Sequence, residues 1–239
     1  MRQYRLSILS IIYLLFSWAC NAQNEDITFT ELVKTKQILL TNEAYFKKDR
    51  SMQGASSFLI KYQDSIYAVS AKHLLGEAMG ISPEVKLKKI NSELIHWSIY
   101  PRTNHLSDDT IYLNANNLIF DSLKSDILML RTNNTSDIHV LSIADTLPKF
   151  YETVYLIGCP YSDEECYQNV YPLKYIGIND DLISCSSAKD IELSGFSGCP
   201  IVNIKGEVFG VLVSGFTSGK TLILYSTHIN EIKKIKHLF

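Results

Sequence analysis

The chain has 239 residues, of which 46% are hydrophobic, so it can bury a sizeable core as one two-lobed domain or as two small ones. Its 23 basic and 25 acidic residues give a net charge of −2, so the composition has no basic excess that would argue for nucleic-acid binding. The 14 tyrosines are typical of an all-β protein with half-buried strands.

Residues 1–22 have the pattern of a secretory signal peptide. Arg2 and Arg5 supply the positive charge at its start, and the apolar run 6–16 that follows is too short for a typical transmembrane helix. This pattern predicts an exported protein, located in the bacterial periplasm, held in the envelope as a lipoprotein, or secreted.

Two cleavage sites fit the end of this segment. Small residues favour ordinary cleavage after Ala22. The alternative is a degenerate lipobox that ends at Cys20, which would make this cysteine the lipidated N-terminus and the only membrane contact. Trp18 is bulky for a lipobox, and we therefore favour the ordinary signal.

Residues 23–49 are predicted to be a lead-in to the domain, partly helical because apolar residues in the run 31–40 partly follow helical spacing. From residue 57 onward, short apolar runs alternate with polar turns, which predicts an all-β barrel or sandwich. The predicted strands are 58–62, 66–71, 85–90, 94–100, 110–113, 118–120 and 127–131, then 153–157, 171–178, 182–186, 200–204, 207–213 and 222–226.

The strands fall into two sets joined near residues 132–152, which fits two β-barrels with a cleft between them. We predict one domain over 50–239, with the first barrel at about 50–140 and the second at about 150–228. Apolar residues at helical spacing predict a terminal amphipathic helix over 229–238.

Four cysteines follow the signal segment: Cys159, Cys166, Cys185 and Cys199. An even number in an exported chain predicts disulfides, and three pairings are open. The alternative is buried unpaired thiols that pack as small hydrophobic groups. The cysteines lack the paired spacing of a zinc site.

The segment 194–200 reads S-G-F-S-G-C-P and precedes two hydrophobic runs, 201–204 and 207–213. A serine flanked by glycines on a tight turn exposes its hydroxyl, and neighbouring backbone N–H groups can converge on one point. Ser197 is therefore a candidate nucleophile. Because serine is a poor nucleophile alone, the chain must also supply a base and an orienting carboxylate.

Both groups are present upstream. A strand pattern at 66–71 runs into His73, the candidate base, and Asp126 stands directly before the apolar run 127–130. Asp121 is the alternative carboxylate, but no apolar run follows it immediately.

With its candidates in the order His, Asp, Ser, the chain resembles the trypsin-like (chymotrypsin-fold) serine proteases, especially the bacterial Deg/Htr-type branch. S-A-K-H at 70–73 matches the family's T-A-A-H, S-D-I-L-M-L at 125–130 its D-I-A-L-L, and G-F-S-G-C-P at 195–200 its G-D-S-G-G-P. The resemblance covers roughly residues 50–230. It implies two six-stranded β-barrels of chymotrypsin type with a C-terminal helix, His73 and Asp126 on the first barrel and Ser197 on the second.

The resemblance also implies an activity. It predicts a serine-type endopeptidase that forms an acyl-enzyme on a protein or peptide substrate, with no metal and no cofactor. The backbone N–H groups of Gly195 and Ser197 would form the oxyanion hole. The substrate pocket would lie near Ile191, with a wall from Ser214 and Gly215. No aspartate matches the trypsin pocket position, so strict Lys/Arg cleavage is not expected. The oligomeric state stays open.

Two positions depart from the family pattern. Phe196 replaces the aspartate before the serine, and no I-V-G-G-like start precedes the domain, so activation by a new N-terminus is not expected. Cys199 replaces the second glycine after the serine and is expected to crowd the leaving-group side. The altered surroundings of Ser197 keep open the alternative of a pseudoprotease that binds peptides or a partner without turnover. An esterase with the same triad is a further alternative, because its chemistry is the same acyl transfer.

Overall fold

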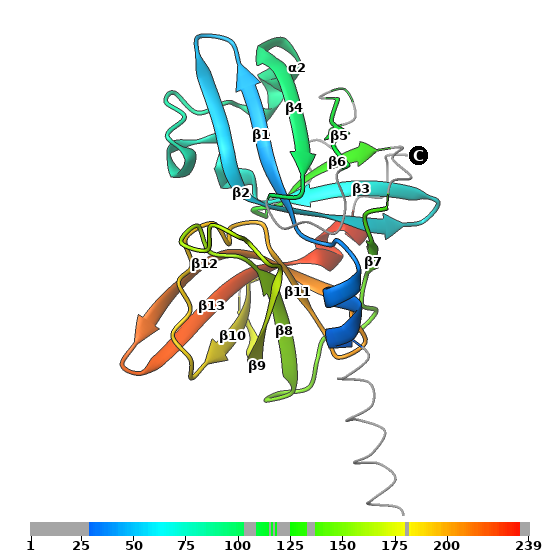
Figure 1. Cartoon of the computed structure of the whole chain (residues 1–239), viewed down its shortest axis with the longest axis vertical. Coiled ribbons are helices and arrows are strands. Elements are labelled where there is room, and N and C mark those ends of the chain that lie inside the picture. The colour runs from blue at the N-terminus through cyan, green and yellow to red at the C-terminus, as the bar shows by residue number, and fades with distance from the viewer. Residues whose placement is uncertain are drawn as a thin grey trace, which may run out of the picture.

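Strands dominate the computed structural model, which describes residues 29–102, 109–114, 116, 118, 125–132, 137–179 and 182–234. They form two all-β halves, one above the other in Figure 1. The predicted two-barrel architecture of chymotrypsin type is confirmed, with one closed barrel and one half-barrel. The predicted signal segment lies outside the described residues.

The first half is a seven-stranded sheet rather than a closed six-stranded barrel in the described residues. Its strands follow the order β5-β4-β1-β2-β3-β6, and β7 pairs in parallel with β2. The strands are β1 Leu40–Phe46, β2 Arg50–Tyr62, β3 Ser65–Ser70, β4 Leu94–Tyr100, β5 Ile111–Tyr112, β6 Leu128–Thr132 and β7 Val140–Ser142.

The second half is a closed barrel in the order β10-β13-β12-β11-β8-β9, as the sequence predicted for this half. Every strand in it overlaps a predicted one. The strands are β8 Thr153–Gly158, β9 Asn169–Asn179, β10 Leu182–Ser187, β11 Pro200–Val202, β12 Val208–Ser218 and β13 Thr221–His228.

Strand β1 begins before the predicted domain boundary at residue 50. A helix covers 29–35, in part as predicted, but β1 then lies in the middle of the sheet between β2 and β4. The sequence pattern did not predict this strand, because polar residues interrupt its apolar ones. Thr41 donates a hydrogen bond to the Ala55 carbonyl oxygen at 3.2 Å, and the buried Asn42 accepts one from the Ser57 hydroxyl at 2.7 Å. Because these partners satisfy the buried polar groups, a strand with a polar sequence can occupy the sheet interior.

Three predicted elements differ in the structure. The predicted strand 85–90 is wrong: the segment holds the 3-10 turn η3 Leu87–Lys89 and leads into the short helix α2 Ile90–Glu93. Its apolar residues pack into the core without pairing as a strand. Leu118 forms an isolated bridge with Leu130. The described start of the terminal helix is the 3-10 helix η5 Ile229–Lys234.

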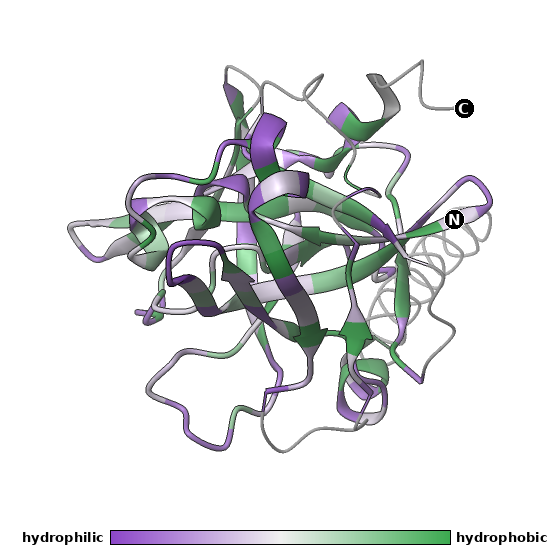
Figure 2. Cartoon of the chain, turned by 90° about the horizontal axis from the view of Figure 1, so that it is seen from above, coloured by the Kyte–Doolittle hydropathy of each residue, from purple (hydrophilic) through white to green (hydrophobic). Residues whose placement is uncertain are grey.

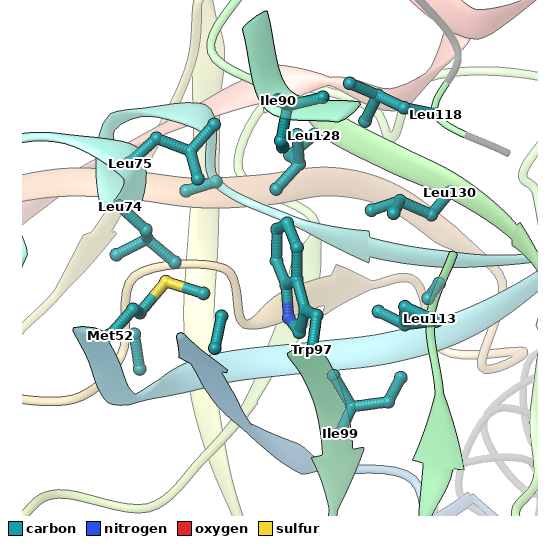
Figure 3. Close-up of a cluster of buried hydrophobic side chains, with 14 of the residues drawn as sticks. Met52, Leu74, Leu75, Ile90, Trp97, Ile99, Leu113, Leu118, Leu128 and Leu130 are labelled. Atoms are coloured by element: carbon teal, nitrogen blue, oxygen red, sulfur yellow. The ribbon is translucent and has the colours of Figure 1, made fainter. Parts of the chain in front are cut away.

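Apolar side chains form three clusters. The first lies within the first half around Trp97, which Figure 3 shows among leucine, isoleucine and methionine side chains. The second joins the halves: Phe58 and Val69 of the first sheet meet Ile157 and Val211 of the second barrel. The third fills the second barrel. The hydrophobic stretches follow the strands, and several connecting turns are hydrophilic (Figure 2). Because the second cluster contains residues of both halves, the junction between the halves is a packed apolar surface.

Candidate active site

His73 and Asp126 meet because β3 and β6 are antiparallel neighbours. Ser70 pairs with Leu128, so the residues that follow β3 lie beside those that precede β6. His73 stands on the 3-10 turn η1 Lys72–Leu75. Its Nδ1 lies 2.5 Å from Asp126 Oδ2, and its backbone N–H donates to Asp126 Oδ1 at 2.7 Å. The carboxylate therefore holds both the ring and the main chain of the histidine.

Ser197 comes from the second half, on the turn between β10 and β11. Its Oγ lies 3.0 Å from His73 Nε2. Its carbonyl oxygen accepts a hydrogen bond from the Ser56 N–H of β2 at 2.8 Å. The turn is thus fixed to the first half by its backbone as well as by the hydroxyl contact.

The structure brings together all three residues that the sequence singled out for this chemistry. The His73 and Asp126 side chains are 28% and 30% exposed, so they lie at the surface of the junction, within reach of a substrate. The competing carboxylate, Asp121, lies outside the described residues.

Two glycines shape the turn around Ser197. Gly195 has φ of +92° and Gly198 has φ of +89°, a conformation that other residues rarely adopt. A Cβ on Gly198 would collide with the Ser56 carbonyl oxygen. Within the described chain, no acceptor bonds the N–H groups of Gly195 or Ser197, the two predicted donors of an oxyanion hole.

Phe196 fastens the turn to the second barrel. Its ring is fully buried in the third apolar cluster and meets the Tyr171 ring edge-on, with centroids 5.5 Å apart. Because Phe196 replaces the aspartate of the family pattern, we expected no ion pair with a new N-terminus at this position. In the structure the Phe196 side chain instead makes apolar contacts in the barrel interior. Burial of a phenylalanine side chain stabilises the folded state by about 2 kcal/mol.

The cysteines divide into one disulfide and two thiols. Cys159 bonds to Cys166, one of the three pairings that the sequence allowed. Cys185 and Cys199 are free and buried. Burial raises the pKa of the Cys199 thiol to about 12, so the neutral form predominates. Because Cys199 packs inside the barrel, the expected crowding of the leaving-group side does not follow from its position.

The predicted pocket residues lie along the second barrel. Ile191 is 7% exposed and belongs to the third apolar cluster, whereas Ser214 is exposed on β12. A Cβ on Gly215 would stand 2.5 Å from Leu193 Cδ1, so the leucine packs directly against this glycine. The region beside Ile191 is therefore apolar and narrow.

Strand β12 has an open edge next to the site. Its partner β11 pairs with it only over Val208 to Val211, whereas β13 accompanies it to Ser218. Beyond Val211 the other side of β12 carries no strand among the described residues. Unpaired backbone groups on such an edge can accept an extended peptide as an added strand.

Three residues at the site escaped the sequence interpretation. Ser56 bonds the Ser197 and Gly195 backbones, Tyr161 covers Gly195, and Arg102 lies over the Tyr161 ring. No motif marks them, because their positions depend on contacts between the two halves. For Ser56 and Tyr161 the only signal was proximity in sequence to Gly54 and to Cys159, and for Arg102 the sequence offers no signal.

The comparisons agree on the fold. The chain is similar to the active form of the Rv3671c protease from M. tuberculosis, with 13% identity over 85% of this chain and 81% of that chain and a TM-score of 0.53. The inactive form of the Rv3671c protease matches with 14% identity over 85% of this chain and 89% of that chain, and with a TM-score of 0.51. No family model and no curated protein matches the chain. At these identities the likeness shows the trypsin-like fold and selects no branch.

The described residues contain no helix long and apolar enough to cross a membrane. The disulfide is of the kind that persists in oxidising, exported compartments.

Proposed function

We propose that the chain is an exported serine endopeptidase that cleaves peptide bonds through His73, Asp126 and Ser197. The observation that carries the proposal is the continuous chain of contacts from Asp126 Oδ2 through both nitrogens of His73 to Ser197 Oγ, at 2.5 and 3.0 Å. It spans the two halves of the molecule. A serine, a base and a group that orients the base in this geometry are the signature of nucleophilic acyl transfer.

Each residue has a distinct role. His73 takes the proton of Ser197 as the hydroxyl attacks the carbonyl carbon, then gives it to the leaving amine. Asp126 accepts the other ring N–H, which fixes the tautomer and stabilises the imidazolium. The N–H groups of Gly195 and Ser197 bind the negative oxygen of the tetrahedral intermediate. Water then hydrolyses the acyl-enzyme with His73 as the base.

The substrate would bind as an extended strand along the open edge of β12. Main-chain hydrogen bonds to Ser214 and its neighbours give affinity for any peptide. Selectivity comes from the apolar region of Ile191 and Leu193, which favours a small or medium apolar side chain before the cleaved bond. No metal or cofactor has a role in this reaction.

The finer assignments rest on the sequence. The Deg/Htr-type branch rests on the three motifs, and export rests on the signal pattern of residues 1–22, supported by the disulfide. We place the protease domain over 50–239, with β1 as an addition from the lead-in.

The second candidate is a pseudoprotease that binds peptides without turnover. The departure at Phe196 favours it, because this residue replaces the aspartate that precedes the serine in the family pattern and so alters the surroundings of Ser197. This alternative makes no use of the Ser197 hydroxyl.

A fluorophosphonate probe separates the two, because it labels an activated serine without knowledge of the substrate. We expect the mature protein to be labelled, and the Ser197→Ala and His73→Ala variants to stay unlabelled. Loss of either residue of a working triad costs on the order of a millionfold in turnover. A folded wild-type protein that resists the probe would refute the protease and support the binding module.

A further inference from the structure

The loop 159–166, closed by the Cys159–Cys166 disulfide, lies against the oxyanion turn; we call this loop the strap. Tyr161 on the strap contacts both halves of the molecule. Its ring covers Gly195, where a Cβ would stand 2.9 Å from ring atoms Cδ1 and Cε1. Its hydroxyl accepts a hydrogen bond from the Ala55 N–H of β2. The tyrosine therefore joins the first sheet to the turn that carries Ser197.

The backbone of Tyr161 controls the orientation of one peptide group. Its N–H donates to the Ser194 carbonyl oxygen at 3.0 Å. A trans peptide is planar, and its C=O and N–H point in opposite directions. Since the Ser194 oxygen is held toward the strap, the N–H of Gly195 in the same peptide must face away from it. The bond thus prevents rotation of the peptide that would withdraw this N–H.

Arg102 holds the strap in place from the first half of the molecule. Its guanidinium donates to the carbonyl oxygens of Pro160 at 3.2 Å, Tyr161 at 3.1 Å and Asp163 at 3.4 Å. Its Cζ lies 5.2 Å from the centroid of the Tyr161 ring, in the arrangement of a cation–π contact. One charged side chain therefore bonds three carbonyl oxygens of the strap.

We propose that Tyr161 is a positioning residue for the oxyanion hole, held by Arg102 and the disulfide. The strap fixes the Ser194–Gly195 peptide with the Gly195 N–H toward the site, and the ring on Gly195 blocks its rotation. The inference rests on the proposed acyl-transfer function.

The test compares fluorophosphonate labelling rates of the wild type, Tyr161→Ala, Tyr161→Phe and Arg102→Gln. Loss of one oxyanion donor costs about 100- to 1,000-fold. We expect Tyr161→Ala to label about 100-fold more slowly, and Arg102→Gln about tenfold more slowly because the strap is only loosened. Both variants at Tyr161 keep the backbone N–H that bonds the Ser194 oxygen, so the comparison isolates the ring. Tyr161→Phe keeps the ring over Gly195 and should stay within about threefold of wild type. The matched control is Tyr112→Ala, which truncates an exposed tyrosine on the edge strand β5.

The pH profile separates positioning of the oxyanion hole from damage to the triad. The midpoint of the labelling rate against pH should be the same in wild type and Tyr161→Ala, because the substitution leaves the three triad side chains in place. A shifted midpoint, or a Tyr161→Ala rate within threefold of wild type, would overturn the inference while the proposed function stands. A wild type that does not label would overturn both. Should Tyr161→Ala fail to fold, Arg102→Gln decides: a wild-type rate refutes the strap.

Discussion

The ring of Phe196 occupies the space that a side chain at Gly158 would need. A Cβ on this glycine would overlap ring atoms Cδ1 and Cε1. Gly158 ends β8, and Phe196 precedes Ser197, so a residue far upstream in the sequence sets where the oxyanion turn can lie. The shape of the barrel interior and the geometry of the candidate site are therefore coupled through one pair of residues.

The first prediction concerns this pair. Gly158→Ala should displace Phe196 and lower the free energy of unfolding by about 1–3 kcal/mol, the usual cost of overpacking a core. Labelling by the fluorophosphonate should fall as well, because the turn moves with the ring. Thermal unfolding and labelling rates measure the two effects. Gly177→Ala is the control for loss of a glycine, since its Cβ would meet no atom within 4 Å, although its φ of +132° adds backbone strain. Labelling at the wild-type rate in Gly158→Ala would show that the turn does not depend on Phe196.

The second prediction concerns the carboxylate. Asp126→Asn keeps the size of the side chain, but its amide can donate to His73 Nδ1 and so favours the wrong ring tautomer. We expect hydrolysis of a peptide substrate to fall by about 10⁴-fold in kcat with little change in thermal stability. The backbone bond from the His73 N–H to this side chain can persist through the amide oxygen. If the variant kept a tenth of the wild-type activity, another carboxylate would have to orient His73. Asp121 would then be the first residue to substitute.

The sequence predicted those parts of the fold and the site that depend on neighbouring residues in the chain. The three motifs at His73, Asp126 and Ser197 each combine a strand pattern with one reactive residue, and the structure brings all three side chains together. The second barrel was predicted strand by strand because each strand carries either a short apolar run or an alternation of apolar and polar residues. Strand β1 was missed since Thr41 and Asn42 are polar and find their partners on β2. No local pattern reveals a partner of this kind.

The third prediction concerns the buried thiols. Burial raises the pKa of Cys185 and of Cys199 to about 12, from an ordinary 9.0. The folded state therefore keeps both protons at a pH where the unfolded chain loses them, so stability is complete below about pH 9 and falls between about pH 9 and pH 12. Peptide mapping after alkylation at pH 8 should find both thiols unmodified in the native protein and modified after denaturation. The disulfide Cys159–Cys166 should be intact in both samples until it is reduced. Rapid native alkylation of Cys199 would contradict its position inside the barrel.

The fourth prediction concerns the lead-in. The Gln168 side chain bonds four backbone groups of residues 33–39: its Oε1 accepts from Ile38 N at 2.9 Å and Leu39 N at 3.0 Å, and its Nε2 donates to the carbonyl oxygens of Val33 at 2.6 Å and Lys36. It thus fastens the end of helix 29–35 and the approach to β1 to the second barrel. No motif could predict this, because every bond spans more than a hundred residues of sequence.

Gln168→Ala should leave these backbone groups without partners and lower the free energy of unfolding by about 1–3 kcal/mol. Hydrogen exchange should accelerate at residues 33–39 and change little in β12, because the loss is confined to the lead-in. Gln168→Glu is the matched variant: it keeps an acceptor for Ile38 and Leu39 but loses the donor to Val33 and Lys36, so its stability should fall between those of wild type and Gln168→Ala. Equal exchange at 33–39 in all three proteins would mean that the apolar contacts of Phe29 and Val33 alone hold the lead-in. Faster exchange in β1 as well would show that the Gln168 hydrogen bonds also stabilise the first sheet. That sheet belongs to the half of the molecule that carries His73.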